Sequence, residues 1–175
     1  QQFIQKFLGD RHACFLSVKH GPDHSYTEDR TLSWHFAIKA ESPKARQIMN
    51  DPHVALTFYW PALARQIRIR GVANLLPAAE YAADYLDRPK ASRASALASR
   101  QSEVLSDAGE LNRKLIKAEE FIAENLDYVA PGWQVYAVAP HIVEFWQGAS
   151  DRNHKRLQFS PSVDSSSWTK ERLWP

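Results

Sequence analysis

The stretch VEFWQGASDRNHKRLQF, residues 143–159, decides the expected fold. Its first part alternates, with Glu144 and Trp146 on one expected face and Val143 and Phe145 on the other. Alternation with a period of two is the pattern of a β-strand that has one side on a core. The protein is therefore expected to build its core on strands of this kind.

The second part of the stretch carries a basic cluster. Beyond Gly148, Arg152, His154 and Arg156 follow at two-residue spacing, and in an extended chain this spacing points all three side chains the same way. Next to Trp146 they suit a planar, anionic ligand, because an aromatic ring can stack on it and guanidinium groups bind phosphate or carboxylate. The alternative interpretation is a solvated basic edge strand.

Composition indicates one ordinary globular domain spanning residues 1–175. Apolar residues make up 44% of the chain and charged residues 24%, and the net charge of +2 is too small to indicate nucleic-acid binding. The single cysteine, Cys14, excludes an internal disulfide and a cysteine-based metal cluster. Its apolar neighbours predict a buried, inert thiol, and its isolation fits a reducing compartment.

Several classes of function lack their sequence signals. No apolar run approaches the ~20 residues that span a membrane, and no signal-peptide pattern is present, so a cytoplasmic protein is expected. The chain begins at Gln1, so a further segment could precede it. The seven histidines show no metal-ligand spacing, and no metal site is expected. Gly-rich phosphate loops and G-x-S-x-G motifs are also absent.

The order of expected elements favours a barrel. Short links between the strands predict antiparallel pairing, and about six or seven strands with three or four inserted helices suit a closed or split β-barrel better than a doubly wound sheet. Residues 91–106 are small and polar and are expected to form a surface. Strands are expected at 13–18, 30–38, 54–60, 66–71, 133–138, 141–147 and 168–173, and helices at 2–8, 43–49, 77–86 and 107–125.

The residues suited to phosphate lie near expected element ends. Lys44 follows Ser42 and Pro43, a typical helix start, where an ammonium group and free backbone N–H groups can bind one anion together. A solvated lysine is the alternative. No nucleophile or carboxylate pair accompanies these residues, so the chemistry is expected to come from a flat, phosphorylated cofactor. The other candidates are Arg30, Gln66, Arg88, Gln101, Arg152 and Arg156.

An ordered series of short motifs resembles the pyridoxamine 5′-phosphate oxidase family from about residue 30 to the last residue. The motifs are NDP at 50–52, VALTFYW at 54–60, RQIR at 65–68, RP at 88–89, SRQS at 99–102, IVEFWQG at 142–148, RNHKR at 152–156 and RLWP at 172–175. The resemblance implies a mainly β fold with inserted helices, an FMN-binding split β-barrel. It also implies a homodimer with FMN at the interface, and a C-terminal dimerisation and substrate segment at about 130–175.

The resemblance also implies roles for individual residues. Arg152 and His154 match a substrate-contacting Arg-x-His and are the expected catalytic residues, and Arg88 and Ser92 match ligands of the substrate phosphate. The implied reaction passes a hydride from an amine or alcohol carbon to the flavin, which dioxygen reoxidises. The expected cofactor contacts from one subunit are Arg30, Thr31, Leu32, Ser33, Ala37, Ile38, Lys44 and Gln66, and those from the other are Gln101, Ser102, Trp146 and Arg156.

The substrate half departs from the family pattern more than the FMN half does. Pro43 stands at a usual arginine, Asp84 at a usual tyrosine and Asn153 at a common leucine, and the substrate-phosphate lysine after the Arg30 strand has no counterpart. Two alternatives to a pyridoxamine or pyridoxine 5′-phosphate oxidase therefore stay open. One is an oxidoreductase with another substrate, similar to the phenazine-biosynthesis flavin oxidases, which share Ser-Arg-Gln-Ser. The other is a non-catalytic flavin-binding protein.

Overall fold

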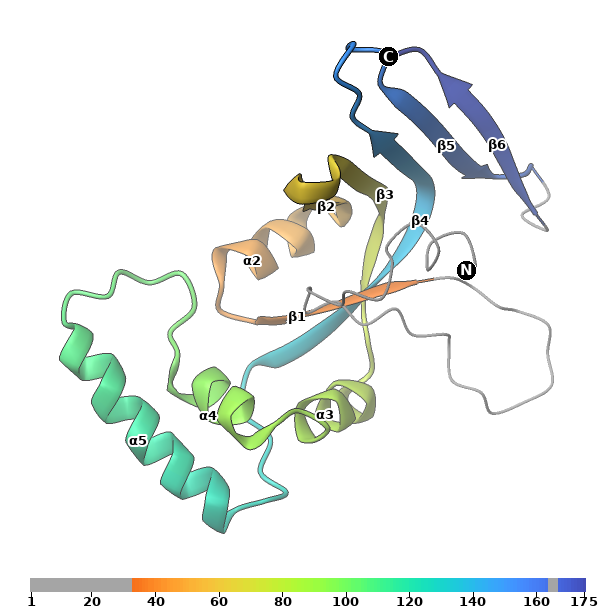
Figure 1. The fold of residues 1–175 in the computed structure, drawn as a ribbon. Coiled ribbons are helices and arrows are strands. Elements are labelled where there is room, and N and C mark those ends of the chain that lie inside the picture. The colour runs from red at the N-terminus through yellow and green to blue at the C-terminus, as the bar shows by residue number, and fades with distance from the viewer. Residues whose placement is uncertain (1–32, 164–166) are drawn as a thin grey trace.

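The computed structural model describes residues 33–163 and 167–175 (Figure 1). The elements expected at 2–8 and 13–18, Cys14, and the candidate residues Arg30, Thr31 and Leu32 lie outside the described residues. The elements in chain order are β1 (Trp34–Lys39), α2 (Pro43–Asn50), β2 (His53–Trp60), a 3-10 turn (Pro61–Leu63), β3 (Arg65–Leu75), α3 (Ala78–Leu86), α4 (Lys90–Ala98), α5 (Ala108–Glu124), β4 (Trp133–Gln147), β5 (Lys155–Pro161) and β6 (Trp168–Leu173).

All strands of the described part form one antiparallel sheet. The strand order is β2-β3-β4-β5-β6, and β1 pairs with β4 off this path. The first half of β4 lies between β1 and β3, whereas its second half lies between β3 and β5. The long strand β4 therefore connects two partly separate halves of the sheet, as Figure 1 shows.

A bulge allows β4 to change neighbours. The β3–β4 register shifts between Arg70 and Gly71, where Gly71 lies opposite Pro140. A Cβ atom on Gly71 would lie 2.3 Å from the carbonyl oxygen of Ala139, so only glycine fits this close approach of two backbones. Because the chain stays extended through Pro140, the prediction of separate strands at 133–138 and 141–147 is wrong, and one continuous strand forms.

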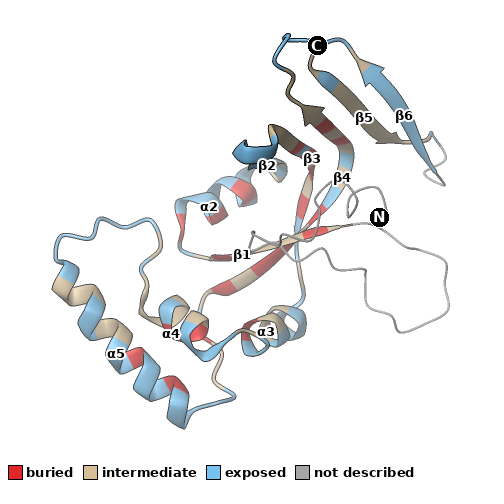
Figure 2. Ribbon diagram, viewed as in Figure 1, coloured by how far each residue is buried: buried red, intermediate tan, exposed pale blue. Residues whose placement is uncertain are grey.

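The main core lies on one face of the sheet, beneath α2. Ile67 and Ile69 of β3 pair with Phe145 and Val143 of β4, and all four side chains are buried. Figure 2 shows buried segments along β3 and β4. Helix α2 begins as its sequence predicts, since the Ser42 hydroxyl accepts a hydrogen bond from the backbone N–H of Ala45. Its apolar stripe, Ala45 and Ile48, completes this core.

Helices α3, α4 and α5 gather beside the first half of β4 (Figure 1). Tyr85 of α3 packs edge-on against Trp133 of β4, with ring centroids 5.3 Å apart. The prediction that residues 91–106 form a surface is only partly correct. Helix α4 covers the first part of this range, and its Ala94 is completely buried against α5. None of the helices in the described part has the length and apolar character needed to cross a membrane.

Candidate cofactor site

A pocket of about 770 Å³ opens between β1, α2 and β2. Its size falls within the range of ~300–1,000 Å³ that small-molecule sites occupy. Phe36 and Ala37 of β1 form one wall, and Trp133 of β4 lies in the lining with Arg88 from the α3–α4 link. Aromatic walls with a few cationic groups suit a flat, anionic ligand. The expected site residues Ala37, Lys44 and Arg88 thus share one pocket.

Lys44 lies in the first turn of α2, within this pocket. The exposed ammonium group forms no ion pair with any described residue, and the helix start adds a partial positive charge. The Ser42 cap uses one backbone N–H of this turn, that of Ala45. These donors fit the phosphate group of FMN, which would bind as a dianion at a helix N-terminus.

The opposite side of the pocket carries Asp51 and His53. Asp51 accepts hydrogen bonds from the backbone N–H of His53 at 3.0 Å and from its ring Nδ1 at 2.7 Å. These bonds, the backbone one first, lower the pKa of the Asp51 carboxyl from its ordinary value. The pocket lining therefore carries a carboxylate as well as the Lys44 ammonium group.

Three other expected cofactor residues form a row across the sheet. Gln66 on β3 pairs with Trp146 on β4, and Trp146 pairs with Arg156 on β5, so all three side chains share one face. Arg156 donates to Glu144 at 2.8 Å and to the backbone carbonyl of Trp174 at 3.2 Å. The hydrogen bond with Glu144 raises the pKa of the Arg156 guanidinium, which keeps its charge fixed. None of these three residues lines the pocket of Lys44.

The turn after β4 holds the expected catalytic residues. His154 packs its ring on Trp146, with centroids 5.0 Å apart, and its Nδ1 accepts a hydrogen bond from the backbone N–H of Ala149 at 3.2 Å. Because a backbone N–H can only donate, this bond uses Nδ1 as an acceptor, and Nε2 is the ring nitrogen left for another partner.

Arg152 departs from the expected extended conformation. Its φ of 65° is left-handed, its side chain is exposed, and β5 begins only at Lys155. The expectation that Arg152, His154 and Arg156 form one extended row is therefore wrong: a turn carries the first two residues and a strand the third.

Gln101 and Ser102 lie on the segment between α4 and α5. Gln101 accepts a hydrogen bond from the backbone N–H of Lys39 at 2.9 Å, and the Lys39 ammonium donates to the carbonyl of Ser99 at 2.7 Å. Ser102 has a left-handed φ of 69°. The segment is thus bound to the end of β1 within the same chain.

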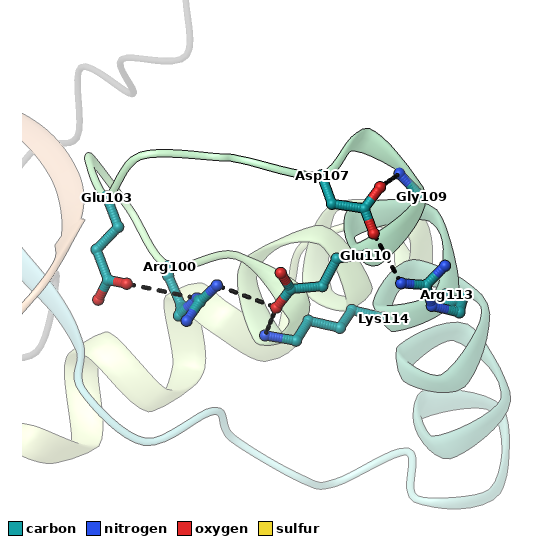
Figure 3. Close-up of polar contacts among 7 residues, drawn as sticks. All are labelled: Arg100, Glu103, Asp107, Gly109, Glu110, Arg113 and Lys114. Atoms are coloured by element: carbon teal, nitrogen blue, oxygen red, sulfur yellow. Dashed lines mark hydrogen bonds and ion pairs between the residues drawn. The ribbon is translucent and has the colours of Figure 1, made fainter.

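Ion pairs also connect this segment to α5 (Figure 3). Arg100 lies 3.0 Å from Glu110 and 3.4 Å from Glu103, and Lys114 lies 2.9 Å from Glu110. Asp107 caps α5 by accepting from the N–H of Gly109. Single exposed pairs contribute at most about 1 kcal/mol, but a connected network restricts the segment more strongly.

The remaining expected residues have mixed positions. Ser33 is half-buried and its hydroxyl lies 2.9 Å from His35 Nε2. Ile38 is buried in the main core, so it could offer a ligand only its backbone. Ser92 is half-buried in the first turn of α4, outside the lining of the pocket that contains Arg88.

Sequence reasoning missed part of the pocket wall. Phe36, Trp133 and His53 come from strands that are far apart in the sequence, and no local motif connects them. Asp84 was noted only as a departure, yet it contacts both Arg88 and Trp133. Alternation within β1 was the one signal available for Phe36.

The sheet and pocket define a class of protein: an antiparallel β fold with inserted helices and a pocket suited to a flat, anionic molecule. Residues 1–121 match the family model described as "Pyridoxamine 5'-phosphate oxidase", and residues 133–175 match "Pyridoxine 5'-phosphate oxidase C-terminal dimerisation region". The chain belongs to the pyridoxamine 5′-phosphate oxidase family. Membership supports FMN as the cofactor.

Curated relatives agree with this family. A pyridoxine/pyridoxamine 5′-phosphate oxidase of Pseudomonas savastanoi pv. phaseolicola is 41% identical over 145 residues, or 83% of this chain. One from Salinibacter ruber is 37% identical over 143 residues, or 81% of this chain. In both cases the match spans 66% of the relative's own length.

Solved structures confirm the expected split barrel. PhzG from Burkholderia lata 383, in complex with tetrahydrophenazine-1-carboxylic acid, superposes with a TM-score of 0.68 at 27% identity, covering 82% of this chain and 69% of that one. A pyridoxamine 5′-phosphate oxidase-related, FMN-binding protein from Nostoc punctiforme gives 0.65 at 18% identity, covering 86% and 77%. At 18% identity, the similarity to the Nostoc punctiforme protein supports the fold alone.

Proposed function

We propose that this protein is an FMN-dependent oxidase of the pyridoxamine/pyridoxine 5′-phosphate type. The observation that carries the proposal is the pocket between β1, α2 and β2, with Lys44 at the start of α2. FMN bound there would supply redox chemistry, the oxidation of the substrate by a hydride equivalent with dioxygen as the final acceptor. The chain supplies binding, orientation and charge.

Residues of the chain bind the cofactor phosphate at one place and contact the substrate at another. Lys44 and the α2 N-terminus bind the cofactor phosphate, and Arg88 contributes the cation at the Trp133 side of the pocket. His154 offers its Nε2–H as a hydrogen-bond donor, because Nδ1 is occupied by Ala149. Arg152 lies two residues away on the exposed turn and offers a positive charge to the substrate.

A homodimer completes the proposed site. Within one chain the expected cofactor residues separate into the pocket of Lys44 and the row of Gln66, Trp146 and Arg156. Two copies can bring one group from each chain to the same cofactor. The match of residues 133–175 to a dimerisation region supports this arrangement, since that region contains Trp146 and Arg156.

A second candidate has the same cofactor with a different substrate. The PhzG structure holds a tricyclic carboxylic acid, and it resembles this chain at 27% identity. In this chain Asp84 replaces the family's usual tyrosine and pairs with Arg88. A substrate with a carboxylate in place of a phosphate is consistent with that pairing.

Replacing Lys44 with alanine is expected to weaken FMN binding about tenfold, because one charge-assisted contact to a phosphate is lost. Quenching of flavin fluorescence on titration into apoprotein measures the affinity. Riboflavin, which has no phosphate, should lose less than twofold. Lys117→Ala, which removes an exposed charge on α5, serves as the control. Equal losses for FMN and riboflavin would contradict phosphate binding by Lys44.

A further inference from the structure

We propose that Asp84 sets the ligand charge that the Arg88 end of the pocket accepts, favouring a neutral or singly charged group over a dianionic phosphate. This inference rests on the second candidate of the proposed function, a flavin oxidase with a different substrate, and deepens the substrate side of that site. The contacts of the Arg88 guanidinium group carry it.

Asp84 binds the two groups that form this end of the pocket. Its Oδ2 accepts a hydrogen bond from Arg88 Nε at 3.0 Å and another from Trp133 Nε1 at 3.2 Å. The guanidinium carbon of Arg88 also lies 4.6 Å from the centre of the Trp133 ring. Arg88 is therefore held on the indole face, with its orientation fixed from both sides.

The pair is shielded enough for its charges to act strongly on each other. The Arg88 and Asp84 side chains are 22% and 17% exposed, in contrast to the exposed pairs on α5. Between partly buried groups, solvent screening is weaker than at the surface. The Asp84 carboxylate then offsets part of the positive charge that Arg88 presents to a ligand, although the Nη groups of Arg88 keep their donor hydrogens.

The two cations of the pocket consequently differ. Lys44 forms no ion pair within the described residues and offers a full charge at a helix start. Arg88 offers directed donors whose charge Asp84 offsets. A phosphate dianion at the Arg88 end would meet the Asp84 carboxylate as well, whereas a carboxylate or hydroxyl would lose less from that repulsion.

The test is a titration of the FMN-loaded protein with inorganic phosphate, followed by calorimetry. Asp84→Asn keeps the size of the side chain and an oxygen acceptor for Trp133, but removes its charge. It should tighten phosphate binding on the order of tenfold. Asp87→Asn removes the neighbouring exposed carboxylate and should change the affinity by less than about twofold.

A double variant assigns the gain to Arg88. Adding Arg88→Gln to Asp84→Asn should return phosphate affinity to the wild-type value or below, because the unpaired guanidinium is removed. Pyridoxine 5′-phosphate and pyridoxine differ only by the phosphate. The affinity for the first relative to the second should therefore rise in Asp84→Asn and fall back in the double variant.

Three results would overturn the inference: no gain in Asp84→Asn, an equal gain in Asp87→Asn, or a gain that survives Arg88→Gln. Failure of the proposed function has a different signature. It would appear as bound flavin that no substrate reduces, and that result leaves the phosphate titration of the FMN-loaded protein unchanged.

Discussion

Replacing Arg152 with alanine is expected to lower turnover on the order of a hundredfold or more while FMN stays bound. Arg152 lies in the turn after β4, two residues before His154, whose ring packs on Trp146. The left-handed backbone at Arg152 lets the turn close through bonds to Ala149. In the proposed function Arg152 would position an anionic substrate and stabilise developing charge, and neither action is needed to hold the cofactor.

The measurement is steady-state oxidation of pyridoxamine 5′-phosphate, with flavin content determined from absorbance. Lys117→Ala removes an exposed positive charge from α5 and should keep wild-type turnover and flavin content. Turnover of Arg152→Ala within about threefold of wild type would contradict the proposed role. Loss of flavin together with activity would instead place Arg152 among the cofactor contacts.

Replacing Arg93 with alanine is expected to lower the free energy of unfolding by about 3 kcal/mol. Arg93 is only 5% exposed, and its guanidinium donates hydrogen bonds to the backbone carbonyls of Leu126 and Tyr128. Its own carbonyl accepts from the Tyr85 hydroxyl at 2.8 Å. Arg93 thereby joins α4 to the link between α5 and β4. Alanine would keep the backbone carbonyl that binds Tyr85 but would lose both guanidinium bonds and leave a cavity.

Urea denaturation measures this loss. Arg113→Ala is the matched control: Arg113 pairs with Asp107 at 2.9 Å, but its side chain is 68% exposed, so the change should stay below about 1 kcal/mol. A loss for Arg93→Ala no larger than that of the control would mean that the buried guanidinium does not connect the helices. If the slope of the free energy of unfolding against urea concentration is unchanged, the substitution has altered stability alone.

Local signals in the sequence predicted the regular elements well. Ser42 and Pro43 marked the start of α2, and the apolar run VALTFYW at 54–60 predicted β2 within one residue. These features depend on neighbours along the chain, through capping, fixed φ and period-two burial. The barrel class also followed from the short links between strands, and the related structures confirm it.

Features that depend on distant contacts could not be predicted. The continuity of β4 requires Gly71 opposite Pro140, and the burial of Arg93 requires carbonyls more than thirty residues away. The spacing of Arg152 and His154 indicated an extended strand, but hydrogen bonds to Ala149 produce a turn instead. Likewise, the pocket collects residues from β1, α2, β2 and β4, and only the fold brings these together.

The central claim, an FMN-dependent oxidase, is tested most directly by the visible absorption spectrum of the purified protein. The spectrum is recorded before and after anaerobic addition of pyridoxamine 5′-phosphate, and again after air is admitted. We expect oxidised flavin bands that bleach with the substrate and return with air. The claim is contradicted by an absence of flavin bands even after incubation with FMN, and bands that stay unbleached contradict this substrate.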